Sequence, residues 1–356
     1  MTVVQPAPDP IADAYARGEN PFDARAGAPV HSNRGKLPPL RTYAAAVLLL
    51  GGLSPHLGGL AWPVDLLGNF SSQLAALTMP ALAWWLIRRR GRTASVAALA
   101  LALHAWALIP GRAAWSGDPA GPDRTPLSVL TFNGLANNPT PERVFELLEL
   151  GPADVVALVE APQEVVAALP SRGTLRAVYP HITTPSGIYK QVGWQVILSR
   201  WPLRPFHADE APARPGVQAA IVDRPGGPFV MIITQPQSPR SPARWLLGNE
   251  IVRHAARTCR EARAEGFPVV LGADLNSTPS GWRSRHLIGH TDLARCKPLL
   301  RAESTYPADR SWPLGIAIDD IWVSAGARVT SWETLDSAGS DHRPVRVGLS
   351  VPVNWK

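Results

Sequence analysis

The stretch VVLGADLNSTP, residues 269–279, decides the fold class of this chain. Its first five residues have the apolar, β-branched character of a buried strand, and Asp274 and Asn276 follow where that strand ends. An Asx turn or a helix N-cap would account for either polar residue by itself. The stretch therefore predicts a buried strand with polar groups at its carboxyl end.

Strand and helix patterns alternate on both sides of this stretch. Apolar strand patterns occupy residues 127–132, 154–160, 195–199, 217–222, 229–234, 317–324, 328–335 and 344–350, and helical patterns occupy 141–150 and about 241–264. Many β-branched strands with a few helices between them predict an α/β layered sandwich.

More polar residues stand at the ends of these strands, where they do not serve the core: Asn133, Glu160, Asp319, Asp341 and His342. Most have an ordinary alternative, since Asn and Asp often form turns after a strand. Asp319 does not, because an unpaired carboxylate inside the apolar string IAIDDIWVS costs free energy to bury. Together these groups are hard oxygen ligands, which suit Mg²⁺ or Mn²⁺ rather than zinc, with one proton-transfer group.

The polar strings resemble a known family when they are read in order. They are TFN (131–133), LVE (158–160), SR (199–200), GADLN (272–276), IDDIWVS (318–324) and SDHRP (340–344). The series resembles the endonuclease/exonuclease/phosphatase superfamily over about residues 127–351, and GADLN and SDHRP are its specific strings. The resemblance implies a four-layer α/β sandwich of the deoxyribonuclease I-like type, at 127–356, that hydrolyses phosphate esters.

The resemblance also implies a metal site. Glu160, with Asn133 beside it, would hold Mg²⁺ or Mn²⁺, and Asp341 would complete or support the metal shell. A divalent cation there would polarise the phosphoryl oxygen and neutralise developing charge.

Catalytic roles follow from the same resemblance. Asp274 would orient or deprotonate the attacking water, and Asn276 would donate a hydrogen bond to the phosphate oxygens. His342 would contact the scissile phosphate or pass a proton, and Asp319 would fix its tautomer by accepting from the other ring nitrogen.

One residue departs from the pattern. Relatives of the nuclease type usually carry a His where this chain has Gln235, in the string TQP after the 229–234 strand. Gln can donate a hydrogen bond to a phosphate oxygen but cannot act as a proton donor. Two hypotheses therefore stay open: a working phosphoesterase, and a catalytically weakened pseudoenzyme or phosphate-ligand binding module. A second oddity is Asp320, where many relatives have His or a large residue.

The N-terminal third is different in character. Residues 43–110 are almost purely apolar apart from one basic cluster, and they contain three runs near the roughly 17–25 residues that a spanning helix needs, which predicts a transmembrane region at 41–111. We expect transmembrane helices at 43–60, 70–87 and 94–110. The alternative is that these runs are core helices of a soluble domain. Before them, residues 1–40 have the composition of a disordered cytoplasmic tail, and after them 112–126 reads as a linker.

Positive charges predict the orientation. Arg88, Arg89, Arg90 and Arg92 fill the loop between the second and third runs, whereas the 61–69 loop has no Lys or Arg. The positive-inside rule then places the N-terminus in the cytoplasm and the catalytic domain on the extracytoplasmic side of a bacterial inner membrane. The predicted orientation of the catalytic domain is reversed if 43–60 does not span. The layout resembles bacterial members of the superfamily with N-terminal transmembrane helices.

Charge and cysteine content limit the partners. The formal charge of +7 suits nucleic acid, phospholipid headgroups and phosphate-ester substrates equally well. The Arg-rich stretch 240–263 reads as a solvated helix face, with a nucleic-acid surface as the alternative. Protein partners are left open by the sequence. Cys259 and Cys296 form no zinc motif, and their pairing is also left open.

Overall fold

The fold is that of a computed structural model, which describes residues 39–109, 111–116, 123–187, 193–206, 216–299 and 301–355. The expected tail at 1–40 therefore lies outside the described residues except for its last two. The chain forms two units, Met1–Tyr43 and Ala44–Lys356. All of the described strands belong to the second unit, and so do the described helices apart from residues 40–43.

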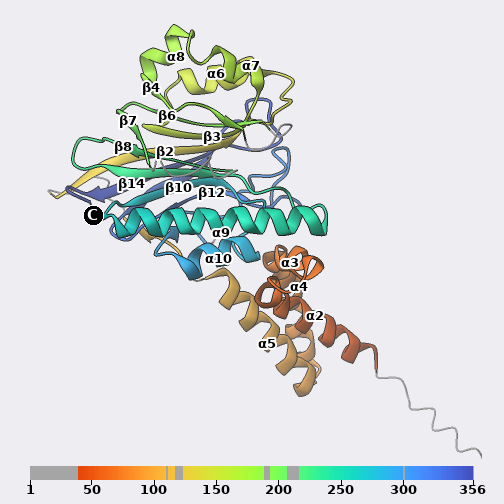
Figure 1. The fold of residues 1–356 in the computed structure, drawn as a ribbon. Helices are drawn as coiled ribbons and strands as arrows, with labels where there is room; N and C mark the ends of the chain where they lie inside the picture. Colours follow the sequence, from red (N-terminus) through yellow and green to blue (C-terminus); the bar gives the residue numbers. More distant parts are fainter. Residues whose placement is uncertain are drawn as a thin grey trace, which may run out of the picture. The chain divides into compact units, whose positions relative to one another are not determined.

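Two β-sheets form the centre of the second unit (Figure 1). The larger sheet has eight strands: β1 (Ala114–Trp115), β2 (Arg124–Asn133), β3 (Val155–Ala161), β4 (His181–Ile182), β5 (Ser186–Gly187), β6 (Trp194–Ser199), β13 (Arg328–Thr334) and β14 (Val345–Pro352). Their order is β1-β13-β14-β2-β3-β6-β4, with β5 also paired to β6. The smaller sheet has six strands in the order β11-β12-β10-β9-β8-β7: β7 (Leu203–Pro205), β8 (Val217–Val222), β9 (Phe229–Thr234), β10 (Val269–Asp274), β11 (Ala294–Arg295) and β12 (Asp319–Val323).

Helices cover the outer face of each sheet, which makes four layers (Figure 1). The larger sheet carries α6 (Pro141–Glu149), α7 (Gln163–Ala168) and α8 (Gly173–Val178), and the smaller sheet carries α9 (Pro242–Ala264) and α10 (Trp282–His290). Three separate apolar clusters lie between the layers, one between the two sheets and one under each set of helices. The predicted α/β sandwich is therefore confirmed.

Strand β3 shows how the sequence produces these layers. Its alternate residues Val155, Ala157 and Val159 face the cluster between the sheets, and Val156 and Leu158 face the cluster under α6–α8. Successive side chains of a strand point to opposite faces, so a strand covered on both sides must be apolar throughout. Each valine or leucine buried in this way contributes roughly 1.5–3 kcal/mol by leaving water.

The N-terminal helices correct one expectation. They are α2 (Leu40–Leu57), α3 (Trp62–Gly68), α4 (Ser71–Ile87) and α5 (Gly91–Leu108). The expected spans 43–60, 70–87 and 94–110 fall on α2, α4 and α5. Within the described residues, however, none of these helices is long and apolar enough to cross a membrane alone. Helices α2 and α3 together reach the required length and composition, but the chain bends by 106° between them.

The segment expected as a linker, 112–126, is paired where the structure describes it. Arg112 forms a bridge with Arg295 of the smaller sheet, and β1 pairs with β13 of the larger one. Strand β2 begins at Arg124, earlier than predicted, because its first residues continue the ladder with β14. The described residues that lead from α5 into the sandwich are thus held by backbone hydrogen bonds to both sheets.

Helix α3 is hydrogen-bonded to the sandwich. The Asp65 carboxylate accepts from the indole Nε1 of Trp245 at 2.8 Å and from the backbone N of Trp282 at 2.9 Å. The indole Nε1 of Trp62 donates to the carbonyl oxygen of Pro239 at 2.7 Å. Asp65 is almost fully buried by these contacts.

The last residue of α3 and the residue that follows it hold the loop after β10. Asn69 Oδ1 accepts from the backbone N of Thr278 at 2.7 Å, and the Thr278 hydroxyl donates to the Asn69 carbonyl oxygen at 2.9 Å. The Ser280 hydroxyl donates to the Gly68 carbonyl oxygen at 2.8 Å. The helical region therefore supports the loop that starts at Asp274.

Candidate active site

The polar residues predicted for the site meet at one edge of the sandwich. Strand β2 runs parallel to β3, and β9 runs parallel to β10, so the carboxyl ends of each pair share an edge. Asn133 is the last residue of β2 and Asp274 the last of β10, and Asn133 Nδ2 donates to Asp274 Oδ2 at 3.0 Å across the two sheets.

Asp319 and His342 reach the same edge because they lie at or just before the first residue of strands that run antiparallel to β10 and β2. Asp319 opens β12 directly opposite Asp274 of β10. His342 lies three residues before β14, which is antiparallel to β2. Topology alone thus collects residues that are far apart in the sequence.

His342 and Asp319 form a buried pair. His342 Nδ1 lies 2.9 Å from Asp319 Oδ2, and the other ring nitrogen, Nε2, lies 3.9 Å from Asp274 Oδ2. The Ser340 hydroxyl holds the backbone of this loop by accepting from the His342 backbone N, and the Tyr306 ring packs beside the imidazole with its centroid 4.8 Å away. The pair therefore has the predicted geometry, with Nε2 directed toward Asp274.

Asp274 is held by its neighbour in the string GADLN. The Asn276 backbone N donates to Asp274 Oδ1 at 2.8 Å, and Asn276 Nδ2 donates to Asp274 Oδ2 at 3.2 Å and to the Pro236 carbonyl oxygen at 3.1 Å. Asn276 has a φ of 49°, a left-handed conformation that Asn tolerates better than most residues. Its amide nitrogen is thus occupied within the site, whereas the sequence predicted that it would face a phosphate.

Glu160 reaches the pocket because strand β3 is irregular there. The β3–β6 register shifts between Leu158 and Ala161, and Glu160 has a φ of 47°. A β-bulge of this kind re-aims a side chain. Gly193 makes the bulge sterically feasible, since a Cβ there would lie 2.8 Å from the Glu160 Cα.

Gln235 contacts Glu160. Its Nε2 donates a short hydrogen bond to Glu160 Oε1, and its own Oε1 is buried without a hydrogen-bond partner among the described residues. The residue that departs from the family pattern is therefore bound to the carboxylate predicted to hold the metal. The sequence had suggested a phosphate contact for this amide instead.

A pocket of about 570 Å³ joins these groups. Of the eight predicted site residues, six line it: Glu160, Gln235, Asp274, Asn276, Asp341 and His342. Asn133 and Asp319 lie buried behind them. The structure thus brings together all eight.

Among the lining residues that were not predicted from the sequence are two arginines and a tyrosine: Arg240, Arg244 and Tyr306. The two arginines belong to the stretch read as a solvated face, and they lie just before and in the first turn of α9. Arg244 Nε is buried and has no hydrogen-bond partner among the described residues. Farther along α9, Arg253 pairs with Glu250, as a solvated face would. The order of charged residues along the sequence did not indicate which arginines of this stretch line the pocket and which face solvent.

Burial and charge shift the acid–base groups. Burial raises the pKa of the Glu160 carboxyl. Burial also raises the pKa of Asp274, and the adjacent charge of Asp319 adds to the effect. For His342, burial lowers the pKa, but Asp319 and Asp274 outweigh it and the net pKa is raised. The site therefore retains protons more strongly than the separate groups would.

The donor groups fit a hard divalent cation. Asp274, Asp319 and His342 each offer a ligand atom within 4.8 Å of the others. A second oxygen-rich corner surrounds Glu160, where the buried oxygens Gln235 Oε1 and Asp341 Oδ1 have no hydrogen-bond partner in the described part of the chain. Carboxylate and amide oxygens are the ligands that Mg²⁺ and Mn²⁺ prefer.

Asp320 does not belong to this site. It faces the other side of β12, where it accepts hydrogen bonds from Arg295 Nε and, at 2.9 Å, from the indole Nε1 of Trp332. The unusual second Asp of IDDIWVS is therefore half of a buried ion pair. Cys259 and Cys296 are both free and buried, so they do not form the disulfide that the sequence left open.

A four-layer sandwich with a His–Asp pair and clustered carboxylates at one edge is the fold of a phosphoesterase. The profile of the Endonuclease/Exonuclease/phosphatase family matches residues 130–342, more than half of the chain, and the chain belongs to that family. The predicted resemblance is confirmed. Enzymes of the family hydrolyse phosphate esters and generally depend on a divalent metal ion.

Solved structures with this fold have low sequence identity to the chain. An endonuclease/exonuclease/phosphatase from Beutenbergia cavernae DSM 12333 is 19% identical with a TM-score of 0.48, over 64% of this chain and 72% of that one. Sphingomyelinase C from Streptomyces griseocarneus is 20% identical with a TM-score of 0.46, over 63% and 99%. Truncated Caenorhabditis elegans TDP2 is 14% identical with a TM-score of 0.48, over 63% and 97%. A search of curated proteins found no match to the sequence.

Proposed function

We propose that this chain hydrolyses a phosphodiester or phosphomonoester. In this proposal Asp274 activates the attacking water, and His342, oriented by Asp319, contacts the scissile phosphate. The observation that carries the proposal is the 2.9 Å contact between His342 Nδ1 and Asp319 Oδ2. Because Asp319 accepts the Nδ1 proton, Nε2 is left to face Asp274 and the pocket. A raised pKa keeps His342 cationic at neutral pH, which suits a group that contacts a phosphate oxygen.

Asp274 has the environment of a general base. Burial raises its pKa toward the working pH, and a base is most effective when its pKa lies there. Asn276 binds both of its oxygens and so orients the carboxylate toward the water site. We therefore assign Asn276 a positioning role.

We propose Mg²⁺ or Mn²⁺ as the cofactor, held by Glu160 with Asn133 and Asp341. When bound, it would act as a Lewis acid on the phosphoryl oxygen. We assign the other corner, formed by Asp274, Asp319 and His342, to proton transfer instead, because His342 and Asp319 are already bound to each other there. Gln235 stabilises the preferred corner by binding Glu160.

The two pocket arginines favour a substrate with more than one anionic group. Arg240 and Arg244 lie in the same pocket as His342, and the unpartnered Arg244 Nε can donate to an anion. Nucleic acid, nucleotides and phospholipid headgroups all satisfy this requirement. A membrane location favours a phospholipid or an extracytoplasmic nucleotide among them.

We also propose that the N-terminal helices attach the chain to a bacterial inner membrane, with the catalytic domain on the extracytoplasmic side. Support comes from large apolar side chains that are more than half exposed on α2, α4 and α5: Val47, Leu50, Leu77, Met79, Trp84, Leu86, Ile87, Leu99 and Trp106. An exposed apolar surface of this extent is typical of a site that contacts a membrane or another protein. The arginines between α4 and α5 lie at the far end of this helix pair from the residues that bind the sandwich, as the proposed orientation requires.

Fusions to the C-terminus test the orientation. Alkaline phosphatase should be active there and a fluorescent protein dark, because the first folds outside the cytoplasm and the second inside. Activity and fluorescence in the reverse pattern would place the catalytic domain in the cytoplasm.

Two substrates separate an enzyme from a pseudoenzyme. Bis-p-nitrophenyl phosphate has a leaving group that needs no proton, so the full chain should hydrolyse it with Mg²⁺ or Mn²⁺ even though Gln235 cannot donate one. Gln235→His should raise the rate mainly on unactivated phosphodiesters, since a general acid typically contributes about 10²–10⁴ in rate. If wild type and Gln235→His were both inert with either metal, the chain would be a binding module.

A further inference from the structure

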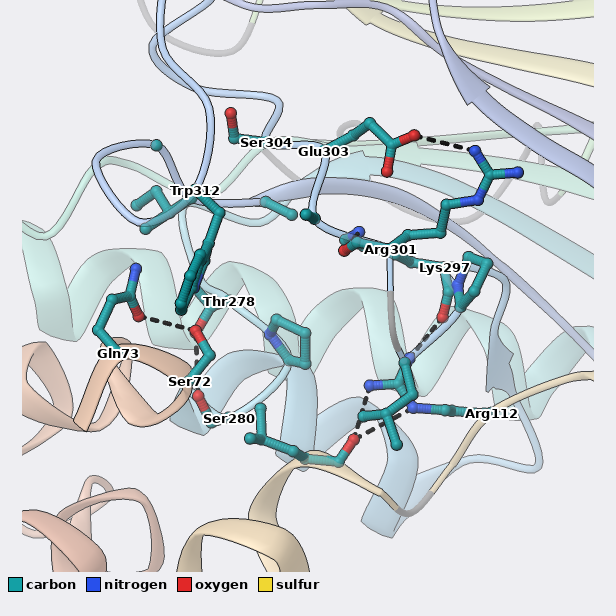
Figure 2. A pocket seen from close by; sticks show the side chains of 18 residues that line it. Ser72, Gln73, Arg112, Thr278, Ser280, Lys297, Arg301, Glu303, Ser304 and Trp312 are labelled. Atoms are coloured by element: carbon teal, nitrogen blue, oxygen red, sulfur yellow. Dashed lines mark hydrogen bonds and ion pairs between the residues drawn. The ribbon is translucent and has the colours of Figure 1, made fainter. Parts of the chain in front are cut away.

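A second pocket lies where the N-terminal helices meet the sandwich (Figure 2). Its volume is about 360 Å³, and it shares no lining residue with the catalytic pocket. Ser72 and Gln73 at the start of α4 and Leu108 at the end of α5 form one wall. The rest comes from Arg112 and from residues 278–280, 297–299, 301–304, 312 and 315–317.

Most of the pocket wall is apolar. Leu108, Leu299, Trp312 and Ile316 contribute large side chains, and Figure 2 shows the Trp312 indole standing beside Gln73. Trp312 and Leu299 are each more than two-fifths exposed. The wall therefore offers apolar surface to a ligand, which stabilises binding in proportion to the area covered.

Two cations at the pocket lack an acidic partner. The Arg112 guanidinium donates to the carbonyl oxygens of Leu108, at 2.7 Å, and of Lys297. The Lys297 ammonium donates to the carbonyl oxygen of Arg301 at 2.7 Å. Figure 2 shows the Arg112 hydrogen bonds as dashed lines. In the described part of the chain no carboxylate lies within ion-pair distance of either group.

The nearby acids are already engaged. Asp320 binds the buried Arg295, and Glu303 pairs with Arg301 at 2.9 Å. Arg112, Arg295 and Lys297 thus share a single acid, Asp320, which leaves a local excess of two positive charges. Burial lowers the pKa of Lys297 to about 8 and that of Arg112 to about 10, so both remain protonated at neutral pH. A buried charge excess is costly unless an anion offsets it.

We propose that this pocket binds an anionic phospholipid, with the phosphate against Arg112 and Lys297 and an acyl chain along Leu108 and Trp312. A small soluble anion would satisfy the cations but leave the apolar wall uncovered. An amphiphile satisfies both, and the exposed Trp106 and Ile109 of the adjoining helix end mark where lipid would lie under the proposed membrane attachment. The inference rests on that attachment and is independent of the proposed hydrolysis.

Thermal unfolding of the full chain in a neutral detergent tests the proposal. Phosphatidylglycerol should raise the Tm by about 4 °C or more at saturation, because a ligand that binds only the folded state stabilises it. Phosphatidylcholine and inorganic phosphate should raise it by much less. An equal shift with phosphate would mean a small-anion site, and an equal shift with phosphatidylcholine would mean unspecific apolar association. Either result overturns the proposal.

Three variants locate the effect. Lys297→Met and Arg112→Gln should each lose most of the shift caused by phosphatidylglycerol, whereas Arg328→Gln, on an exposed arginine of β13, should keep it. Lys297→Met keeps the side-chain length and removes a buried charge, so its lipid-free Tm should be no lower than that of wild type. A full shift in both pocket variants would exclude this site. Membrane fractionation of the chain tests the attachment separately, since lipid binding by the pocket can fail in a chain that still sediments with membranes.

Discussion

The carboxylate of Asp65 accepts a hydrogen bond of 2.8 Å from the indole Nε1 of Trp245, which joins the short helix α3 to helix α9. Asp65→Ala should therefore destabilise the whole chain. It leaves that indole and the backbone N of Trp282 without their acceptor, at a cost of about 2–4 kcal/mol. Denaturant unfolding of the full chain measures the loss. Asp309→Ala, at an exposed acid, is the control, and an equal loss in both variants would contradict a structural role for the α3 contact.

Glu160→Gln should abolish Mg²⁺-dependent hydrolysis and leave the fold intact. The substitution keeps the shape of the side chain but removes the charge that a divalent cation requires. Turnover at increasing Mg²⁺ concentration, together with a melting curve, is the measurement. Glu164→Gln on the exposed face of α7 serves as the matched control. Unchanged turnover at saturating Mg²⁺ in folded Glu160→Gln would remove Glu160 from the site.

Asp319→Asn should lower kcat by about 10²–10⁴ with a smaller effect on KM, since the imidazole loses the group that orients it. The same change should lower the pKa of His342 toward the ordinary range of histidine, because Asp319 is the main cause that raises it. An NMR titration of the His342 ring protons reads this shift directly. A loss of activity without a change in the His342 pKa would show that Asp319 acts only on the fold.

Stability should rise between about pH 8 and pH 10 because of Lys297. Burial lowers its folded-state pKa to about 8 from the ordinary 10.5, so in this window the unfolded chain binds the proton that the folded chain has released. More protons on the unfolded state mean that the free energy of unfolding increases with pH, here by on the order of 2–3 kcal/mol. Unfolding of wild type and Lys297→Met across the window isolates the effect. Equal slopes in the two proteins would refute it.

The sequence predicted the main strands because each is long enough to display a pattern. Strand β3, VVALVEA, is apolar at nearly every position, and a buried strand is what such a run forms. Strands β1, β4, β5 and β11 have two residues each, too few for any periodicity, and they were missed. The helices α4 and α5 were located correctly, and α4 ends at Ile87 as expected, but α5 starts three residues earlier than expected, at Gly91-Arg92-Thr93, which the apolar run did not include.

For the site, the sequence predicted which residues gather but not which atoms bind each other. Strand ends identified Asp274, Asp319 and His342, because polar groups there are poorly explained by the core. The bond from Gln235 to Glu160 depends on a β-bulge, which is set by pairing with β6 and has no local signal in the chain. Likewise, Arg244 lines the pocket because of where α9 begins, and charge order does not encode that.

The short segment between helix α5 and strand β2 has a mechanical consequence. Its described residues are paired to both sheets, through Arg112 and through β1. They therefore attach the sandwich to the end of α5 firmly and do not act as a flexible tether. The catalytic pocket is instead held at a fixed distance from α4 and α5. Under the proposed attachment to a bilayer, it would reach only phosphate groups that lie at one height above the membrane surface. Inserting residues into this segment would then widen the choice of substrates without any change in the pocket.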